Sequence, residues 1–151
     1  MSDRRHLYRL LLVLLALGPV ATASTSMGFQ PVSGEELAMK SEPLAPGASA
    51  IILFRQVDCD DMRGSHEYDY FRIKILTEEG RKYADIEIPF VDNWSDVVNI
   101  NARTIRPDGS IVNFDGKVFK KTVVKAKGYK FLAKTFTLPD VQVGSILEYY
   151  Y

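Results

Sequence analysis

Apolar and polar residues alternate with a period of two along most of the chain after residue 50. The clearest stretch is 82–90, where Ile86, Ile88 and Phe90 are separated by polar or turn-forming positions. Because successive side chains of a β-strand point to opposite faces, this alternation predicts strands with one buried face and one solvated face. The strands expected from the pattern span 50–57, 67–77, 82–90, 96–106, 110–114, 117–125, 131–138 and 145–151.

Short turn sequences separate these expected strands. Residues 107–110, Pro-Asp-Gly-Ser, are a clear example, because proline presets the first central φ angle and glycine accepts a positive φ. No interval between the strands is long enough for a crossover helix. The pattern therefore predicts an all-β fold, an antiparallel β-sandwich with one short N-terminal helix. In strand 96–106, the residues expected to face inward are Val98, Ile100 and Ala102.

One expected strand, 67–77, changes its alternation part-way along. Tyr68 and Tyr70 have one parity, whereas Ile73 and Ile75 have the other. An extra residue in one strand of a pair shifts the parity in this way, so the switch indicates a β-bulge near Phe71.

The last expected strand ends in three consecutive tyrosines, Tyr149 to Tyr151. On an unpaired terminal strand they would leave an aromatic edge exposed, which natural β-proteins avoid. We therefore expect the sandwich to be truncated on its C-terminal side, so that 50–151 is the N-terminal portion of a domain and the native polypeptide continues.

The first 23 residues have the order of a secretory signal peptide. Three arginines within residues 1–9 precede an apolar run from Leu10 to Leu17, and Ala21-Thr22-Ala23 supplies the small residues of a cleavage site. The apolar run is shorter than the roughly 20 residues that a membrane span needs. We expect export to the periplasm or the medium with no stable membrane anchor after cleavage, and an uncleaved anchor is the alternative.

Residues 24–49 are expected to form a leader with one short helix. Ser33 and Glu36 have the spacing of a capping box, in which the serine accepts a hydrogen bond from the helix backbone and the glutamate reaches back to the cap. This spacing predicts a helix over about 34–41. The apolar residues expected to hold the leader against the sheet are Leu37 and Met39.

Composition and charge exclude several classes of protein. The chain has 151 residues, of which 46% are hydrophobic, so it suits a single globular domain whose core needs neither a cofactor nor a structural metal. It carries 19 Lys and Arg residues against 19 Asp and Glu residues, which argues against a nucleic-acid partner. A single cysteine, Cys59, cannot form an intramolecular disulfide.

Several stretches together resemble a known family. They are residues 48–53, 83–90, 102–109 and 138–149, and the most specific are Pro107-Asp108-Gly109 and the run from Pro139 to Tyr149. The sequence is similar over most of 31–151 to the exported bacterial domain of unknown function that precedes transglutaminase-like domains. The resemblance implies a β-sandwich ahead of a papain-like transglutaminase fold whose Cys-His-Asp triad lies downstream. It assigns no catalytic residue to this chain.

Cys59 invites an interpretation as a nucleophile, with His66 as a possible base. Its immediate neighbours Asp58, Asp60 and Asp61 argue against this, because nearby carboxylates disfavour a thiolate. The same three aspartates offer oxygen ligands to a hard cation such as calcium, but they lack the glycine and the distal glutamate of an EF-hand loop. A solvated acidic turn is the favoured interpretation, and no metal site is assigned.

Lysines and aromatic residues are interleaved between residues 117 and 134. Basic side chains mixed with aromatic rings can bind a polyanion, although lysines along a strand also protect the edge of a sheet from aggregation. Trp94 stands in a polar turn, and the core has no evident need of it. The candidate binding residues for a glycan or peptide are Trp94, Lys120, Lys125 and Tyr129.

The favoured function is a non-catalytic accessory domain that positions or presents substrate to a downstream transglutaminase-like domain of the same chain. One alternative is an extracytoplasmic module that binds a glycan, or a peptide added to a sheet edge. Another alternative is an enzyme that acts through a Cys-His-Asp site outside these residues. No cofactor is expected.

Overall fold

The structure is a computed structural model and describes residues 28–151 except residues 63 and 127. The predicted signal peptide, 1–23, lies outside the described residues. The elements in chain order are α1 (Gly34–Ala38), β1 (Ala50–Asp60), β2 (His66–Ile75), the 3-10 helix η1 (Glu78–Ala84), β3 (Asp85–Val91), β4 (Asn101–Ile105), β5 (Ile111–Asn113), β6 (Phe119–Ala126), β7 (Tyr129–Thr137) and β8 (Ile146–Tyr150).

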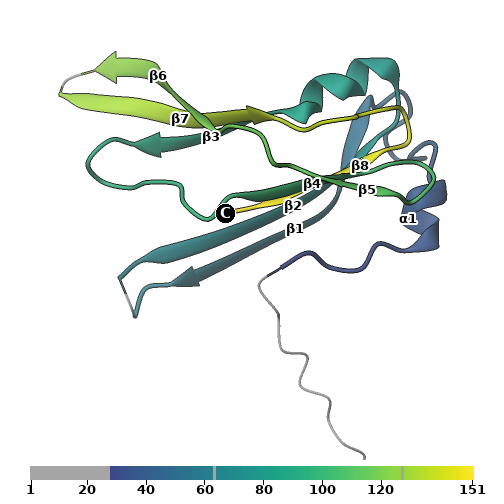
Figure 1. The fold of residues 1–151 in the computed structure, drawn as a ribbon, viewed down its shortest axis with the longest axis horizontal. Helices are drawn as coiled ribbons and strands as arrows, with labels where there is room; N and C mark the ends of the chain where they lie inside the picture. Colours follow the sequence, from purple (N-terminus) through teal and green to yellow (C-terminus); the bar gives the residue numbers. More distant parts are fainter. Residues whose placement is uncertain (1–27, 63, 127) are drawn as a thin grey trace, which may run out of the picture.

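The strands of the described residues form two sheets, which lie one above the other in Figure 1. Sheet A has the strand order β1-β2-β8-β4-β5, and sheet B has the order β3-β7-β6. Every strand pair is antiparallel. The predicted all-β fold, an antiparallel sandwich with a short N-terminal helix, is confirmed. No helix of the described part of the chain combines the length and the hydropathy that crossing a membrane requires.

The core lies between the two sheets. Ile86, Ile88 and Phe90 on β3 are buried while Asp85 and Glu87 are exposed, as the alternation predicted. Apolar side chains from β2, β4, β7 and β8 complete the core, among them Ile73, Ile75, Ala102, Leu132, Phe136 and Leu147.

Two expected strands, 82–90 and 96–106, begin three or more residues later than the pattern predicted. Residues 82–84 belong to η1 rather than to a strand. Ion pairs three residues apart, Arg81 with Glu78 and Lys82 with Glu79, support this helical turn. Residues 96–100 are irregular, and Asn99 has a φ of 55°, which is incompatible with an extended strand.

The side chains of the 96–100 segment therefore differ from the prediction. Val98 is 58% exposed, so it does not face inward, whereas its neighbour Val97 is buried. Ile100 packs against the core and Ala102 is buried, as expected. The helix α1 is also shorter than predicted, because Met39 leaves helical geometry with a ψ of 127°.

The parity switch in β2 has another cause than a bulge near Phe71. The register shift lies in β1, between Ile52 and Phe54. Within β2, nearly every residue from Tyr68 to Ile75 is buried. One face of β2 packs into the core through Ile73 and Ile75, and the other is covered by the leader, which binds Arg72 and Lys74. Burial on both faces removes the simple alternation.

The three terminal tyrosines do not form an exposed edge, which corrects the premise of that expectation. The strand β8 lies between β2 and β4 in sheet A. Tyr151 continues the pairing by two backbone hydrogen bonds with Asp69, each 3.1 Å long, and its hydroxyl donates to the Asp69 carboxylate at 3.0 Å. The Tyr149 ring contacts Phe136 in the core, and the Tyr150 ring contacts Tyr68 on the side covered by the leader.

Candidate functional site

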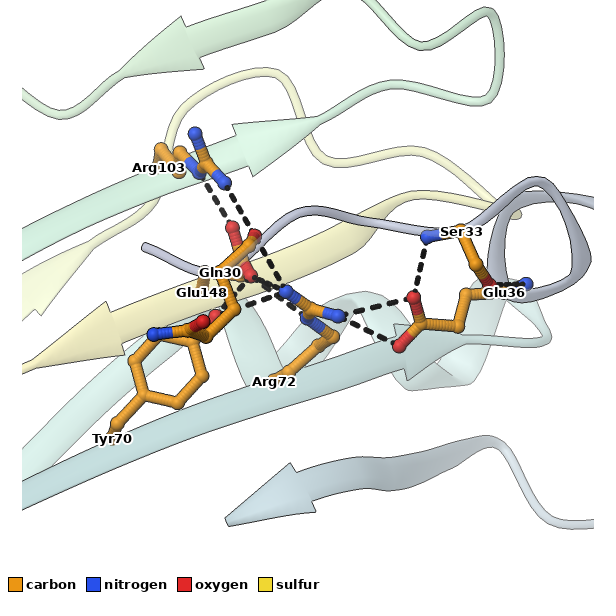
Figure 2. Close-up of polar contacts among 7 residues, drawn as sticks. All are labelled: Gln30, Ser33, Glu36, Tyr70, Arg72, Arg103 and Glu148. Atoms are coloured by element: carbon orange, nitrogen blue, oxygen red, sulfur yellow. Dashed lines mark hydrogen bonds and ion pairs between the residues drawn. The ribbon is translucent and has the colours of Figure 1, made fainter. Parts of the chain in front are cut away.

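A cluster of charged side chains is buried on the face of sheet A that points away from sheet B (Figure 2). At its centre is Glu148 on β8, whose carboxylate has no exposure to solvent. Arg72 Nε donates to the Glu148 carboxylate at 2.8 Å, and Arg72 Nη2 lies 2.7 Å from the same oxygen. Arg103 Nε donates to the other carboxylate oxygen at 2.5 Å. The Tyr70 hydroxyl also donates to this carboxylate.

The strand register brings these residues together. Glu148 pairs directly with Arg72 on β2 at one side and with Arg103 on β4 at the other. Directly opposite residues of antiparallel strands project to the same face about 5 Å apart, which is within reach of an arginine–carboxylate pair. The pairing of the three central strands therefore creates the cluster.

The leader completes the cluster from outside the sheet. Arg72 Nη1 donates to both carboxylate oxygens of Glu36 at 2.8 and 3.0 Å, and Arg72 Nη2 donates to the Gln30 carbonyl at 2.7 Å. The predicted capping box is confirmed, because Glu36 also accepts from the Ser33 backbone at 2.7 Å. One glutamate thus caps its own helix and binds the sheet. The Arg103 guanidinium carbon lies 4.2 Å from the centroid of the Phe29 ring.

Lys74 is a second buried cation on the same face. Its Nζ donates to the Leu37 carbonyl at 2.7 Å and to the Gly144 carbonyl at 2.6 Å. Burial lowers the pKa of Lys74, an effect that Glu36 opposes. Lys74 therefore links the leader to the turn that precedes β8. The expected anchoring by apolar residues is accordingly only part of the contact, since Leu37 and Met39 are half-buried.

The electrostatics of the cluster favour stable pairing rather than proton transfer. Burial, followed by the hydrogen bond to Glu148, raises the pKa of Tyr70 to about 12. Burial raises the pKa of Glu36, but hydrogen bonds from Ser33 and Arg72 outweigh it and the net pKa lies below its usual value. Burial opposes the charge of Arg72, yet Glu36 and Glu148 raise its pKa. These residues stay in fixed charge states near neutral pH, so the arrangement is suited to holding the chain together.

The two most specific motifs of the sequence meet at one corner of the sandwich. Arg106, next to the Pro107 turn, pairs with Asp140 at 2.5 Å, and the Thr104 hydroxyl donates to the Pro139 carbonyl at 2.7 Å. Gly144 has a φ of +88°, and an added Cβ there would lie 3.3 Å from the Pro107 ring. Both motifs therefore position β4, β5 and β8, and Glu148 belongs to the second.

The predicted binding residues do not form a single group. Trp94 is 79% exposed and its ring lies 6.3 Å from that of Tyr129 in an edge-to-face arrangement. Lys120 lies opposite Lys134 in the β6–β7 pair. Lys134 and Tyr129 are five residues apart on β7 and so point to opposite faces, which places Lys120 and Tyr129 on opposite faces of sheet B. The backbone of Lys125 pairs with Lys130, and its side chain lies outside the described part. Their role in binding stays a prediction.

Cys59 is exposed and its thiol donates to the Glu67 carboxylate at 3.7 Å. Desolvation and the Glu67 charge raise the pKa of the Cys59 thiol, which disfavours the thiolate. Glu67 is opposite Cys59 in the hairpin whereas His66 is opposite Asp60, so Cys59 and His66 project to opposite faces.

Asp58 and Asp60 have local partners. Asp58 accepts from the Gln56 amide at 2.5 Å, and Asp60 accepts from the Met62 backbone at 3.0 Å. Within the described residues, no three His, Cys, Asp or Glu side chains are placed to hold a metal ion.

Sequence reasoning missed Arg72, Arg103, Glu148 and the contact of Glu36 with the sheet. A signal was present: Arg72 and Lys74 interrupt the apolar run of 70–75, and Glu148 interrupts the apolar run of 146–149. Charged residues inside such runs indicate either a solvated face or a buried ion pair, and pairing two distant strands from one sequence is needed to decide between them.

A profile of one protein family, described as a domain of unknown function, DUF3857, matches residues 63–151. The chain belongs to the DUF3857 family. The match includes β2 to β8, and with them Arg72, Arg103 and Glu148, whereas α1 and β1 precede it. Searches of curated proteins and of solved structures each found no match to this DUF3857 chain.

Proposed function

We propose that this DUF3857 chain is a non-catalytic accessory domain of an exported transglutaminase-like protein, and that it positions or presents substrate by packing against the downstream domain. Export follows from the predicted signal peptide, and the partner follows from the family resemblance of the sequence. The surface that supports the proposal is the outer face of sheet B.

Exposed apolar side chains lie toward both ends of that outer face, and Lys121, paired with Glu87, lies between them. Phe119 on β6 is 62% exposed and Phe131 on β7 is 41% exposed. Phe131 pairs with Val124 on β6 and with Val91 on β3. Its neighbour Leu132 faces the core, and successive residues of a strand point to opposite faces. Phe131 therefore faces away from sheet A, with Val124 exposed beside it.

The same strip continues at both of its ends. Tyr129 shares the parity of Phe131 and contacts Trp94, while Phe119 lies two pairs beyond Ala133 toward the far end of the hairpin. Several exposed apolar residues on one sheet face are typical of an interaction surface. We define the outer strip of sheet B as Trp94, Phe119, Val124, Tyr129 and Phe131.

One observation favours a second function, a glycan-binding module. Trp94 and Tyr129 form an exposed edge-to-face pair, and flat aromatic faces with polar groups suit sugar rings. A peptide added to the free edge of β6 is the corresponding peptide-binding mode. In either case the chain would bind its ligand without the downstream domain, which distinguishes these functions from the proposed one.

The test is a pair of substitutions on the outer strip in the complete protein. Phe119→Ser with Phe131→Ser should loosen the contact between the domains and speed limited proteolysis between them, because an interface loses most when a central aromatic side chain is removed. The matched control is Val57→Ser, at a similarly exposed site on the edge strand β1 of the other sheet. Equal proteolysis of both variants and the parent protein would contradict the proposal.

A further inference from the structure

Of the predicted leader, 24–49, residues 28–40 lie against sheet A and 41–49 form a linker to β1. Residues 28–40 contact the sheet in the manner of a bound peptide. Sheet side chains hold them at successive points: Arg103 contacts the Phe29 ring, Arg72 binds Gln30 and Glu36, and Lys74 binds the Leu37 carbonyl. The partners are a ring, two backbone carbonyls and a carboxylate, and a peptide that forms the α1 turn can supply them.

The leader does not pair with sheet A as a strand. Across the described residues, no backbone-to-backbone hydrogen bond joins 28–40 to sheet A. No residue of 28–40 is fully buried. The linker that follows, 41–49, contains Pro43, Pro46 and Gly47, and Leu44 within it is 94% exposed. The contact is therefore made by side chains reaching across a surface, and the linker is accessible.

If the leader left, the charged cluster would be exposed to water and would not be buried without partners. Arg72 and Arg103 would keep their pairs with Glu148, which lies in the sheet itself. The uncovered surface would carry three cations, Arg72, Arg103 and Lys74, against the single carboxylate of Glu148, a net charge of 3 − 1 = +2. Since this surface would then be open to water, the large penalty for an unpaired charge in the interior does not apply.

We propose that this face of sheet A is a carboxylate-selective peptide-binding surface whose ligand is the leader of this chain, bound reversibly through Glu36. The rest of the sandwich forms without the leader, and the leader governs access to this surface. This surface is on the opposite side of the molecule from the outer strip of sheet B, so the two proposals are independent.

The experiment uses the full chain with a protease recognition sequence inserted after Leu44 in the linker. After cleavage, a fluorescent peptide of residues 28–42 is added in excess, and its binding is followed by fluorescence anisotropy while circular dichroism reports the β-structure. The same peptide is tested with Glu36→Gln and, as a matched control, with Glu35→Gln, whose side chain is exposed on the same helix.

The labelled peptide should replace the cleaved leader with the β-structure intact. Glu36→Gln should weaken binding by about tenfold or more, because a charge-assisted, two-point hydrogen bond is lost. Glu35→Gln should bind within about twofold of the parent peptide. Three results would each overturn the proposal: loss of the β-structure when the leader is displaced, no exchange of the leader, or equal binding of the Glu36→Gln and parent peptides.

Discussion

Removing the charge of Glu148 should be far more damaging than removing that of an exposed glutamate. Glu148 is fully buried and is paired with two arginines whose side chains are 5% and 15% exposed. Glu148→Gln keeps the size of the side chain but leaves those guanidinium groups without their central counter-charge. Breaking a buried ion pair on one side costs about 3–5 kcal/mol of the free energy of unfolding.

Urea unfolding followed by circular dichroism measures this loss. With a slope of about 2 kcal/mol per molar urea, the midpoint should fall by about 1.5–2.5 M. The control is Glu87→Gln, because Glu87 and its partner Lys121 are roughly half exposed and such surface pairs contribute at most about 1 kcal/mol. A midpoint for Glu148→Gln no lower than that for Glu87→Gln would refute the structural role of the buried cluster.

Three further outcomes are expected. Glu36→Gln should lower the free energy of unfolding at pH 7. The gap between the variant and the parent should shrink below about pH 4, because a carboxyl group with a lowered pKa contributes stability that is lost as pH falls through that pKa. Urea unfolding at a series of pH values measures this gap. Gly80→Ala should cost at least about 2 kcal/mol, since its Cβ would lie 2.0 Å from the Ser49 carbonyl oxygen, whereas Gly34→Ala, with open space around it, should change thermal stability by under about 1 kcal/mol. Cys59→Ala should leave the activity of the complete protein intact, and a loss of activity without unfolding would reverse the assignment of Cys59.

Local signals in the sequence predicted local structure well. The Pro107-Asp108-Gly109 turn joins β4 and β5 with a φ of +84° at Gly109, and the Ser33–Glu36 capping box begins α1. The alternation in β3 correctly identified its buried face. Each of these features depends on a few neighbouring residues whose chemistry permits one conformation, so no knowledge of distant strands was needed.

The charged cluster could not be predicted in the same way. Whether Arg72 and Glu148 face solvent or interior depends on which strands are neighbours, and they are 76 residues apart in the chain. The leader adds a second non-local effect, because it covers a face of sheet A that would otherwise be solvated. Burial of that face removed the period-two signal from β2 and made a covered central strand resemble a bulged one.

The most direct test of the proposed function is hydroxyl-radical footprinting of the chain alone and within the complete protein. Side-chain oxidation reports exposure, and Phe54 on β1, 41% exposed and outside the outer strip, serves as the internal reference. The proposal predicts that Phe119 and Phe131 are oxidised in the chain alone and protected in the complete protein, while Phe54 reacts equally in both. Equal oxidation of all three residues in the two samples would contradict it.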